Sequence, residues 1–448
     1  MKAKKIKSII LGLATLVFGG VNAQMTFNAQ YMSRGEMRHG FGTMATKGMA
    51  PGIFISQRAR IGGVYTGEKF KINFSVQDVR TWGSVANSAI DTKSLLSVYE
   101  ANVELLVNKK LTVKIGRQAI AYDDERILGG LDWAMQGRRH DAVVIKYQAD
   151  STLTFHAGLA YNQSSESNKY SKYTVTGNYQ NFQYAWVNKL YKKFNFSFLA
   201  LNNGVSYYKI PTGSATTTDS LAVAFSQTIG LRSEYKADKF NFLAYGYYQM
   251  GQVVDNKFPY AQSAKFANAF DVCAEVGFKP VKGLLITVGT EILSGTSQYA
   301  SGSANKTNSF DPIFGTNHKF NGYMDYFYVG NHSATVGLWD NYLRVSYAKG
   351  KSIYSINGHY FNVATDVKNV YEGALKMDAN LGSEIDITHL FNYSDGVTIQ
   401  TGYSQFFGTS TLQALRPGTS WEEISNYFYV MLIVRPGSVK FPKTGLKM

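Results

Sequence analysis

Residues 66–77 read TGEKFKINFSVQ, a short polar turn followed by eight residues that alternate between apolar and polar side chains. In an extended strand the apolar residues share one face, namely Phe70, Ile72, Phe74 and Val76. The polar residues share the other face, namely Lys71, Asn73, Ser75 and Gln77. Residues 111–115, 153–161, 194–198 and 397–403 alternate in the same way. The pattern predicts a sheet with one apolar and one polar face.

The composition agrees with a large antiparallel sheet. Aromatic residues make up 14% of the chain, with 31 Tyr and 28 Phe, and there are 42 Gly but only 8 Pro. Cys273 is the only cysteine, which excludes an intramolecular disulfide and a cysteine-based zinc site. The seven histidines show no H-x-x-x-H or H-E-x-x-H spacing, so no metal site is predicted.

Residues 1–23 are predicted to be a cleaved secretory signal peptide. Four lysines precede an apolar run from Ile9 to Phe18, and the segment ends in Val21-Asn22-Ala23. The run is too short to be a membrane-spanning helix, and no later segment contains about twenty consecutive apolar residues. Any membrane span must therefore consist of strands. Removal of the four lysines lowers the formal charge from +15 to +11, so the mature chain is still basic.

The lengths of the connections are a second signal for the fold. Short polar turns are predicted at 66–69, 108–110, 148–151, 191–193, 236–238, 279–282, 349–351 and 394–396. Longer polar stretches lie between them, at 35–52, 82–94, 122–137, 163–177, 206–221, 253–266, about 300–340, 365–378 and 409–422. Bacterial outer-membrane barrels alternate short periplasmic turns with long extracellular loops in this way. Eight turns and nine loops join eighteen strands, an even number that leaves both chain ends in the periplasm.

We therefore predict an all-β fold: a single transmembrane antiparallel β-barrel of about 18 strands in the bacterial outer membrane. The barrel domain comprises residues 24–435, and residues 436–448 form a short C-terminal tail. Residues 318–330 are also strand-like, and counting them as a strand would change the total. A soluble sandwich or propeller does not explain the regular alternation of tight turns and long loops, and no repeat of 40 to 50 residues is found.

Hairpin registers predict which charges enter the lumen, because residues that face each other across a hairpin point to the same side of the sheet. At the turn 66–69, Tyr65 is expected to face Phe70 on the lipid side and Ile61 to face Phe74. Arg60 would then face Ser75, and Arg58 would face Gln77, on the lumen side. Val64 and Lys71 also fall on the lumen side.

The next two hairpins add charges to the lumen. At 108–110, Val107 faces Leu111, Leu105 faces Val113 and Val103 faces Ile115 on the lipid side, and Glu104 and Lys114 are expected to form an ion pair inside. At 148–151, Tyr147 is expected to face Leu153 outside, while Lys146 faces Thr154 and Val144 faces His156 inside. An Arg or Lys facing lipid at the midplane would cost about 2–4 kcal/mol, which supports this assignment of faces.

Eighteen strands enclose a lumen too wide to be filled by strand side chains alone. The wall is predicted to carry Arg58, Arg60, Lys71, Glu104, Lys114 and Lys146. With the net charge of +11, this wall predicts a channel that prefers anions. The alternative is that these charges are ordinary solvated lumen residues paired with acids such as Glu104.

Several motifs resemble the alginate-export family of outer-membrane proteins. They are R-A-R at 58–60, D-V-R-T-W-G at 78–83, G-R-Q-x-I-x-Y-D-D-E-R-I-L-G at 116–129, D-W at 132–133, R-R-H-D-A at 138–142 and G-Y-S-x-F at 402–406. The resemblance is strong over about residues 53–147 and diffuse afterwards. It implies a monomeric eighteen-stranded barrel whose Arg- and Lys-lined pore passes an acidic polysaccharide, with loops acting as gates.

The resemblance also implies which charged positions matter. The basic positions that match are Arg58, Arg60, Arg80, Arg117, Arg126, Arg138 and Arg139. The acidic positions that match are Asp78, Asp124, Asp132 and Asp141. We expect Arg117 and Arg126 at an electropositive rim, with Asp123, Asp124, Glu125 and Asp132 as neutralising partners. Strict alternation puts Arg117 on the lipid side, so a bulge, or the end of the lipid-facing zone near the rim, must intervene.

Other functions are less well supported by the same residues. No G-x-S-x-G motif occurs and the histidines are scattered, so an enzyme is not predicted. No cofactor is predicted; calcium binding by the Asp-rich loop 122–137 is an alternative, although no D-x-[DN]-x-[DN]-G spacing occurs. A general or anion-preferring porin for small-solute uptake is the main rival, and an adhesive or structural barrel is a minor one.

The expected partners follow from this reading. They are outer-membrane lipid, an anionic polysaccharide or small anionic solute, and periplasmic export or uptake components. No nucleic-acid partner is expected.

Overall fold

A computed structural model describes residues 24–88, 95–168, 173, 175, 178–208, 221–254, 264–300, 305–327, 332, 335–369, 375–416, 421–422 and 424–441. The expected signal peptide, residues 1–23, lies outside the described residues, as does the end of the expected tail, residues 442–448. No helix among the described residues is long and apolar enough to cross a membrane.

Twenty strands belong to one sheet, and eighteen of them form a closed ring. The ring contains β1 (Gln24–His39), β2 (Gly52–Thr66), β3 (Phe70–Thr81), β4 (Leu96–Leu106), β5 (Leu111–Gln118), β6 (His140–Gln148), β7 (Leu153–Tyr161), β8 (Asn181–Tyr191), β9 (Phe194–Tyr208), β10 (Leu221–Lys236), β11 (Phe240–Val253), β12 (Lys265–Phe278), β13 (Leu284–Leu293), β15 (Leu338–Lys349), β16 (Ser352–Asn362), β17 (Asn380–Ser394), β18 (Val397–Gly408) and β19 (Ile424–Val434). Two short strands, β14 (Lys306–Thr307) and β20 (Val439–Phe441), pair with β12 and β1. The described helical elements are η2 (Asn317–Lys319) and α2 (Ser410–Leu415).

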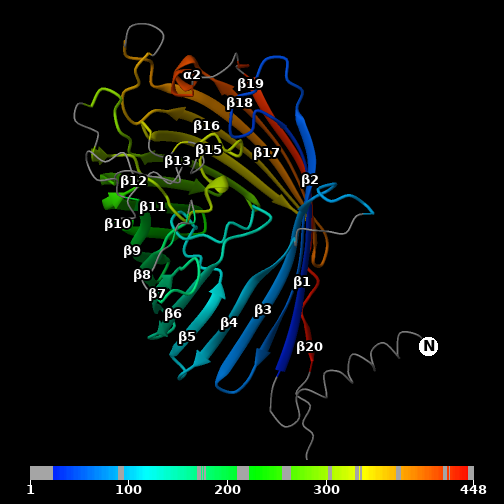
Figure 1. Cartoon of the computed structure of the whole chain (residues 1–448). Helices are drawn as coiled ribbons and strands as arrows, with labels where there is room; N and C mark the ends of the chain where they lie inside the picture. The colour runs from blue at the N-terminus through cyan, green and yellow to red at the C-terminus, as the bar shows by residue number, and fades with distance from the viewer. Residues whose placement is uncertain are drawn as a thin grey trace, which may run out of the picture.

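Each ring strand is antiparallel to the next one along the chain, and β19 returns to β1 from Tyr31↔Val434 to His39↔Asn426. The tilted strands lie side by side around the barrel in Figure 1. The eighteen-stranded prediction is confirmed, and all eight short turns lie at one end of the barrel where the sequence placed them. We call this the turn end and the opposite end the loop end. Residues 318–327 contain η2 and turns instead of a strand.

The two faces of the wall match the predicted alternation. Ile61 and Phe74 point outward, with exposed fractions of 64% and 49%, whereas Arg58 points into the lumen and is fully buried. Lys71, Lys114 and Lys146 alternate with outward apolar neighbours and therefore also face the lumen. The assignment of faces that placed lysine and arginine inside is the one adopted by the chain.

Two hairpin registers differ from the prediction by two residues. Tyr65 pairs with Ile72 instead of Phe70, and Arg60 pairs with Gln77 instead of Ser75. The cause is the turn, because the Gly67 N–H donates to the Phe70 carbonyl at 2.9 Å and Thr66 remains in the strand. A shift of two residues changes the partners of Arg58 and Lys71 but leaves every side chain on its predicted face.

The turn between β6 and β7 is shifted in the same way. Lys146 pairs with His156, and Tyr147 pairs with Phe155. The Asp150 carboxylate accepts hydrogen bonds from the backbone N–H groups of Thr152 (2.7 Å) and Leu153 (3.1 Å), which moves the turn one residue along the chain. By contrast, the register at 108–110 is as predicted over its ladder, with Glu104 opposite Lys114 and Leu105 opposite Val113.

Arg117 stays on the outward face because β5 contains no register break. Its ladders run continuously through Ala101↔Arg117 and Arg117↔Asp141. The nearby irregularity is in β4, where the pairing with β3 skips Tyr99, so that Tyr99 and Glu100 both turn toward the lumen. Of the two explanations expected for Arg117, the end of the apolar band is the one that applies, since this residue lies next to the loop end of β5.

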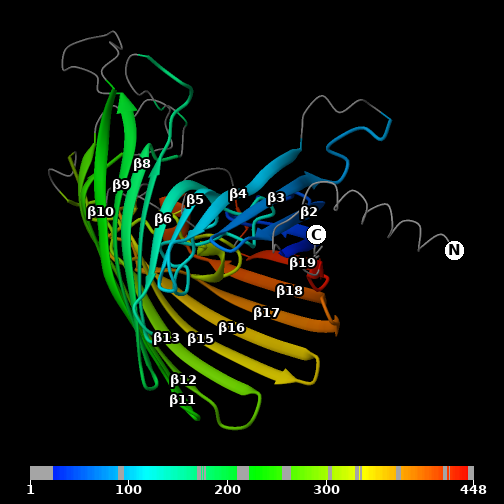
Figure 2. The ribbon, with the colours of Figure 1, turned by 90° about the horizontal axis from the view of Figure 1, so that it is seen from below.

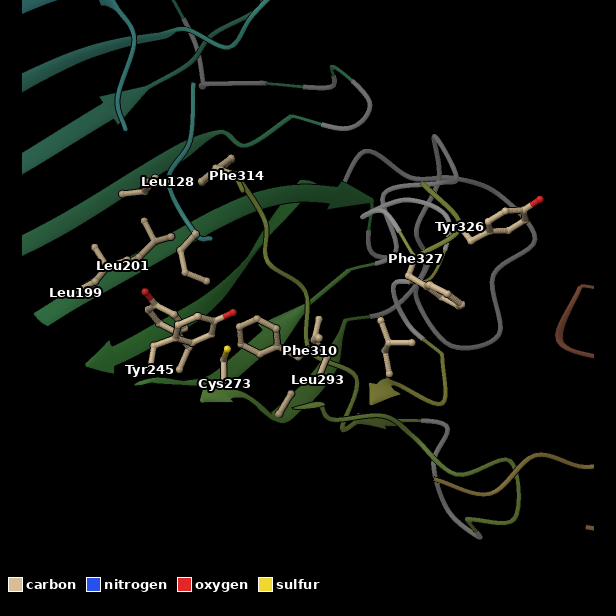
Figure 3. Packing of buried hydrophobic residues seen from close by; sticks show 14 of the residues in the cluster. Leu128, Leu199, Leu201, Tyr245, Cys273, Leu293, Phe310, Phe314, Tyr326 and Phe327 are labelled. Atoms are coloured by element: carbon tan, nitrogen blue, oxygen red, sulfur yellow. The ribbon is translucent and has the colours of Figure 1, made fainter. Parts of the chain in front are cut away.

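The hydrophobic core lies inside the barrel, between the wall and two loops that enter it. Residues 119–139 form inner loop A, and the described residues between β13 and β15, namely 294–300, 305–327, 332 and 335–337, form inner loop B. Figure 2 shows both, in cyan and yellow-green, inside the ring of strands. In Figure 3, Leu128 of loop A and Phe314 of loop B lie beside Leu201 of the wall, and Phe310 lies beside Leu293. This lumen is therefore packed with side chains over part of its cross-section.

Large tyrosines on the lumen face lie over glycines on the neighbouring strand. Directly paired examples are Gly158↔Tyr184, Gly230↔Tyr247, Gly289↔Tyr342 and Gly402↔Tyr429. At Gly402, an added Cβ would lie only 2.2 Å from Cε1 of Tyr429. The glycine thus provides room for the ring, which in turn covers bare backbone.

We expect Gly402→Ala to lower the unfolding temperature of the barrel, with a loss of about 1–3 kcal/mol from overpacking against Tyr429. Heat-dependent migration on a detergent gel measures this temperature. Gly358→Ala is the matched control, because a Cβ there meets no atom within 4 Å. Equal behaviour of the two variants would contradict the proposed role of the Gly–Tyr pairs.

Candidate functional site: the lumen and its inner loops

The two inner loops are joined to each other in the lumen. Leu128 and Phe314 form a parallel β-bridge, and the Gly129 N–H donates to the Phe314 carbonyl at 2.9 Å. The Thr316 N–H donates to the Glu125 carbonyl at 2.9 Å, and the Thr316 hydroxyl donates to the Glu125 carboxylate. Loops A and B are therefore connected to each other inside the lumen, and together we call them the plug.

Loop A is held to the wall at β1 and β2. Arg58 donates to Asp132 Oδ1 at 2.8 Å and to the Met135 carbonyl at 3.1 Å. Arg34 donates to the Trp133 carbonyl at 2.8 Å, and its guanidinium carbon lies 4.1 Å from the Trp133 ring centroid. Arg58 faces the lumen as predicted, but its guanidinium forms an ion pair with Asp132 of loop A.

Arg126 binds loop A to the opposite wall. Its Nε lies 3.1 Å from Asp271 on β12 and 2.9 Å from Glu291 on β13. Its two terminal nitrogens donate to Asn317 and Asn321 of loop B, both at 3.2 Å. Arg126 is 1% exposed, so it lies in the interior and not at the expected rim.

The charge of Arg126 is stable despite its burial. Burial disfavours the guanidinium, but Glu291 and Asp271 together raise its pKa above the ordinary value. Taking three charged groups out of water is costly, and only close pairing with satisfied hydrogen bonds offsets that cost. Arg126 is therefore one of the contacts that hold loop A inside the lumen.

The acids beside Arg126 fasten loop A elsewhere. Asp123 accepts a hydrogen bond from the indole N–H of Trp186 at 3.0 Å, and burial raises the pKa of its carboxyl. Asp124 pairs with Arg232 on β10 at 3.2 Å. Asp132 pairs with Arg435 at 3.0 Å as well as with Arg58. These acids do neutralise basic groups, but their ion pairs are with Arg232, Arg58 and Arg435 and not with the expected Arg117 and Arg126.

The remaining predicted rim residues fall into two groups. Arg80 pairs with Asp78 through a 2.7 Å hydrogen bond, and Arg117 pairs with Asp141 through two bonds of 2.8 Å. Both pairs lie on the outward face toward the loop end of their strands. Arg138 and Arg139 end loop A: Arg138 donates to the Gly315 carbonyl at 3.1 Å, and Arg139 to the Gln136 carbonyl at 3.4 Å.

Inward charges are separated around the ring. On β1 to β6, basic residues outnumber acidic ones, with Arg34, Arg38, Arg58, Arg60, Lys71, Lys114 and Lys146 against Glu36, Glu100 and Glu104. On β12 to β17 the wall is acidic, with Asp271, Glu275, Glu291, Asp340, Glu384 and Asp386 beside Arg344. We call the first the basic face and the second the acidic face. The charged side chains of the wall are therefore separated by sign around the ring, which the overall charge of the chain does not reveal.

The basic face has its most accessible cations near the turn end. Glu104 is shared by Lys71 at 3.9 Å and Lys146 at 3.5 Å, and Lys114 pairs with Glu100 at 3.8 Å. The expected Glu104–Lys114 ion pair is therefore replaced by these contacts, because Glu100 shares the lumen face of β4 with Glu104 and lies within reach of Lys114. Arg60 donates to Gln77 at 3.0 and 2.7 Å and covers the Tyr99 ring.

The sequence reading missed several residues of this site. Arg34, Arg232, Asp271 and Glu291 all point inward from strands outside the three hairpins treated above. The alternation of DVCAEV at 271–276 places Val272, Ala274 and Val276 on one face and Asp271 on the other, and so predicts Asp271 in the lumen. His318 of loop B stacks on Trp133 with ring centroids 4.1 Å apart, and no pattern in the sequence signals that contact.

We expect Arg126→Gln to release the plug, because it leaves Asp271 and Glu291 buried without their cation at a cost of about 3–5 kcal/mol. Single-channel recording should show a larger and noisier conductance than that of the wild type. Arg117→Gln is the matched control, since an exposed ion pair contributes only about 0–1 kcal/mol. An unchanged conductance in Arg126→Gln, with the barrel folded, would show that this arginine does not hold the plug.

Solved structures of outer-membrane channels share the fold. OccAB4 of Acinetobacter baumannii is 11% identical, with a TM-score of 0.57 over 94% of this chain and 98% of that chain. OpdQ of Pseudomonas aeruginosa is 11% identical, with a TM-score of 0.55 over 94% and 98%. OpdK of P. aeruginosa, solved with vanillate, is 9% identical, with a TM-score of 0.55 over 94% and 100%. At these identities the likeness concerns the fold alone, and no curated protein matches the chain.

The sequence model of one family, described as alginate export, matches residues 23–422. The family and the fold are those of outer-membrane channels and not of enzymes. Because this match covers nearly the whole chain of 448 residues, the protein is a member of the alginate export family and is located in the bacterial outer membrane.

Proposed function

We propose that the channel passes anionic solutes, and most of all an acidic polysaccharide or oligosaccharide, along the basic face of its lumen. The observation that carries this proposal is the excess of lysine and arginine on β1 to β6. The resemblance of R-A-R at 58–60 and of the motif at 116–129 to the family supports the same cargo class.

The arrangement of charge favours anions more directly than the net charge does. Lys71 and Lys146 share Glu104, so the pair of ammonium groups is not fully neutralised, and their side chains are 40% and 34% exposed. An anion that passes near these lysines gains attraction from both.

Uptake of small anions is a second candidate, and the inner loops favour it. Loops A and B fill part of the cross-section with buried side chains, which suits a narrow solute better than a polymer. The structure of OpdK with vanillate shows that a barrel of this fold can hold a small carboxylate. On this reading the plug acts as a size filter and does not need to move.

We expect wild-type protein in a planar bilayer to be anion-selective, and Lys71→Glu combined with Lys146→Glu to shift its reversal potential toward cation selectivity. The reason is that both substitutions invert the charge on the accessible part of the basic face. Lys239→Glu is the control, because that lysine is exposed in a turn outside the lumen. Cation selectivity of the wild type, or an equal shift with the control, would contradict the proposal.

A test of polymer length separates the two cargo classes. Uronate oligomers of increasing length are trapped inside reconstituted vesicles, and their release is measured. Passage that continues beyond a few sugar units supports polysaccharide transport, whereas passage of monomers alone supports small-anion uptake.

A further inference from the structure

Four turns that follow one another around the turn end carry most of its lysine. They join β8 to β9, β10 to β11, β12 to β13 and β15 to β16, at residues 191–193, 236–239, 279–283 and 349–351. Each contains two lysines, which makes eight, and their one acid is Asp238. The other four turns contain three lysines and three acids in all. The positive charge of the turn end is therefore concentrated in one arc, which we call the lysine arc.

The lysines of the arc are accessible, and most have no countercharge. Seven of the eight are exposed, and Lys279 is half-buried. Among the described residues, Lys236 is the only one of the eight with an ion-pair partner, Glu234 at 2.9 Å. Lys279 donates to the amide oxygen of Asn241 at 3.1 Å, which is a neutral partner. The arc therefore presents an excess of positive charge to its surroundings.

Outward aromatic rings lie directly beside the arc. Tyr191 and Phe194 flank its first turn and are 57% and 39% exposed. The other turns are flanked by the exposed rings Phe240, Phe278, Tyr347 and Tyr354. Rings of adjacent strands are in contact, as in Phe240 and Phe278, whose centroids are 5.1 Å apart. Outer-membrane barrels carry such rings where the hydrocarbon layer ends. The lysines of the arc therefore lie at the level of the lipid headgroups.

Two lysines of the arc lie on the lipid side of the wall. The Lys192 ammonium is 5.4 Å from the centroid of the Tyr191 ring. Lys349 follows Tyr347 by two residues on β15 and shares its outward face. By contrast, the lumen side of β12, β13 and β15 belongs to the acidic face, so the arc does not continue the basic face of the lumen.

A groove beside the third turn combines apolar and basic groups. It has a volume of about 400 Å³ and is lined by residues 279–285 together with Asp238. Val281 is 61% exposed there, next to the exposed Lys282. Asp238 is the one carboxylate in the groove, against two lysines. Apolar surface beside a cation matches an amphiphile with an anionic head.

We propose that the lysine arc binds the phosphate headgroups of anionic phospholipids in the periplasmic leaflet of the outer membrane, with one lipid seated in the groove at 279–285. The turn end faces that leaflet because short turns are periplasmic. Any phospholipid offers a phosphate, but a zwitterionic one also brings a cation, so a net-anionic lipid neutralises the excess of lysine better. The lysine stems cover the edge of the aromatic belt while their ammonium groups reach the phosphates.

The test is native mass spectrometry of the full chain released from nanodiscs that contain phosphatidylethanolamine and phosphatidylglycerol in equal amounts. We expect phosphatidylglycerol to exceed phosphatidylethanolamine about threefold among the retained lipids. The triple variant Lys192→Gln, Lys282→Gln and Lys349→Gln should bring the two lipids to equal retention. The matched control is Lys47→Gln, Lys265→Gln and Lys306→Gln, which removes three exposed lysines at the loop end and should keep the wild-type ratio.

Two results would overturn the proposal: equal retention of both lipids by the wild type, or the same fall in both triple variants. Lysine-dependent binding of soluble polyphosphate without any lipid preference would also overturn it, since the arc would then bind a soluble polyanion. Heat-dependent gel migration verifies that each variant is folded. Because lipid retention involves no transport, the result is independent of the anion selectivity of the channel.

Discussion

The interior of this barrel depends on the pairing of Arg126 with Asp271 and Glu291. One buried guanidinium joins loop A to β12 and β13 and also holds Asn317 and Asn321 of loop B. The segments that it connects lie far apart in the chain, since Arg126 and Asp271 are 145 residues apart. A buried ion pair is weak evidence for stability, because an apolar replacement of similar shape often does as well. Its specific effect is to join distant segments, because one guanidinium contacts β12, β13 and loop B at the same time.

The closed ring of strands is what makes such an interior possible. Every ring strand pairs with two neighbours, so the wall needs no support from within and the loops are free to adopt a structure of their own. The lumen face then has to accommodate both polar contacts to the loops and large tyrosines over glycines. The alternation of apolar and polar residues is enough to specify the wall, and the packed loops are a separate feature of the interior.

Much of the wall could be predicted from the sequence, since the physical rules for it are local. The polar residues near 66–69 and 148–151 predict turns at these places to within a residue, and alternation predicts the faces of Arg58, Arg60 and Lys146. The registers of these two hairpins differ from the prediction by two residues, and a two-residue change of pairing leaves every side chain on its predicted face, so alternation does not detect it. Alternation therefore determines the face of a residue more reliably than its partner.

The paths of the loops could not be predicted in the same way. The run of acids beside Arg126 suggested neutralisation within the loop or with Arg117, and it gave no hint of Asp271, Arg232 or Trp186. These contacts come from segments that are distant in the sequence, and a period of two says nothing about them. Net charge was misleading for a related reason, since it ignores the position of each group, and the lumen charges are separated into a basic and an acidic face.

This separation links the plug to the pathway. Arg58 faces the lumen on the basic face, yet Asp132 of loop A occupies it at 2.8 Å, much as the carboxylate of a passing anion would. An anion can therefore reach Arg58 only by displacing Asp132, whereas Lys71 and Lys146 are accessible without any movement of the loop. The carboxylate of Asp132 is itself 53% exposed and also pairs with Arg435, so displacement leaves it with a second cation and water. Loop A is thus held by an arginine–carboxylate pair, which is also the kind of interaction by which the lumen would bind an anionic solute.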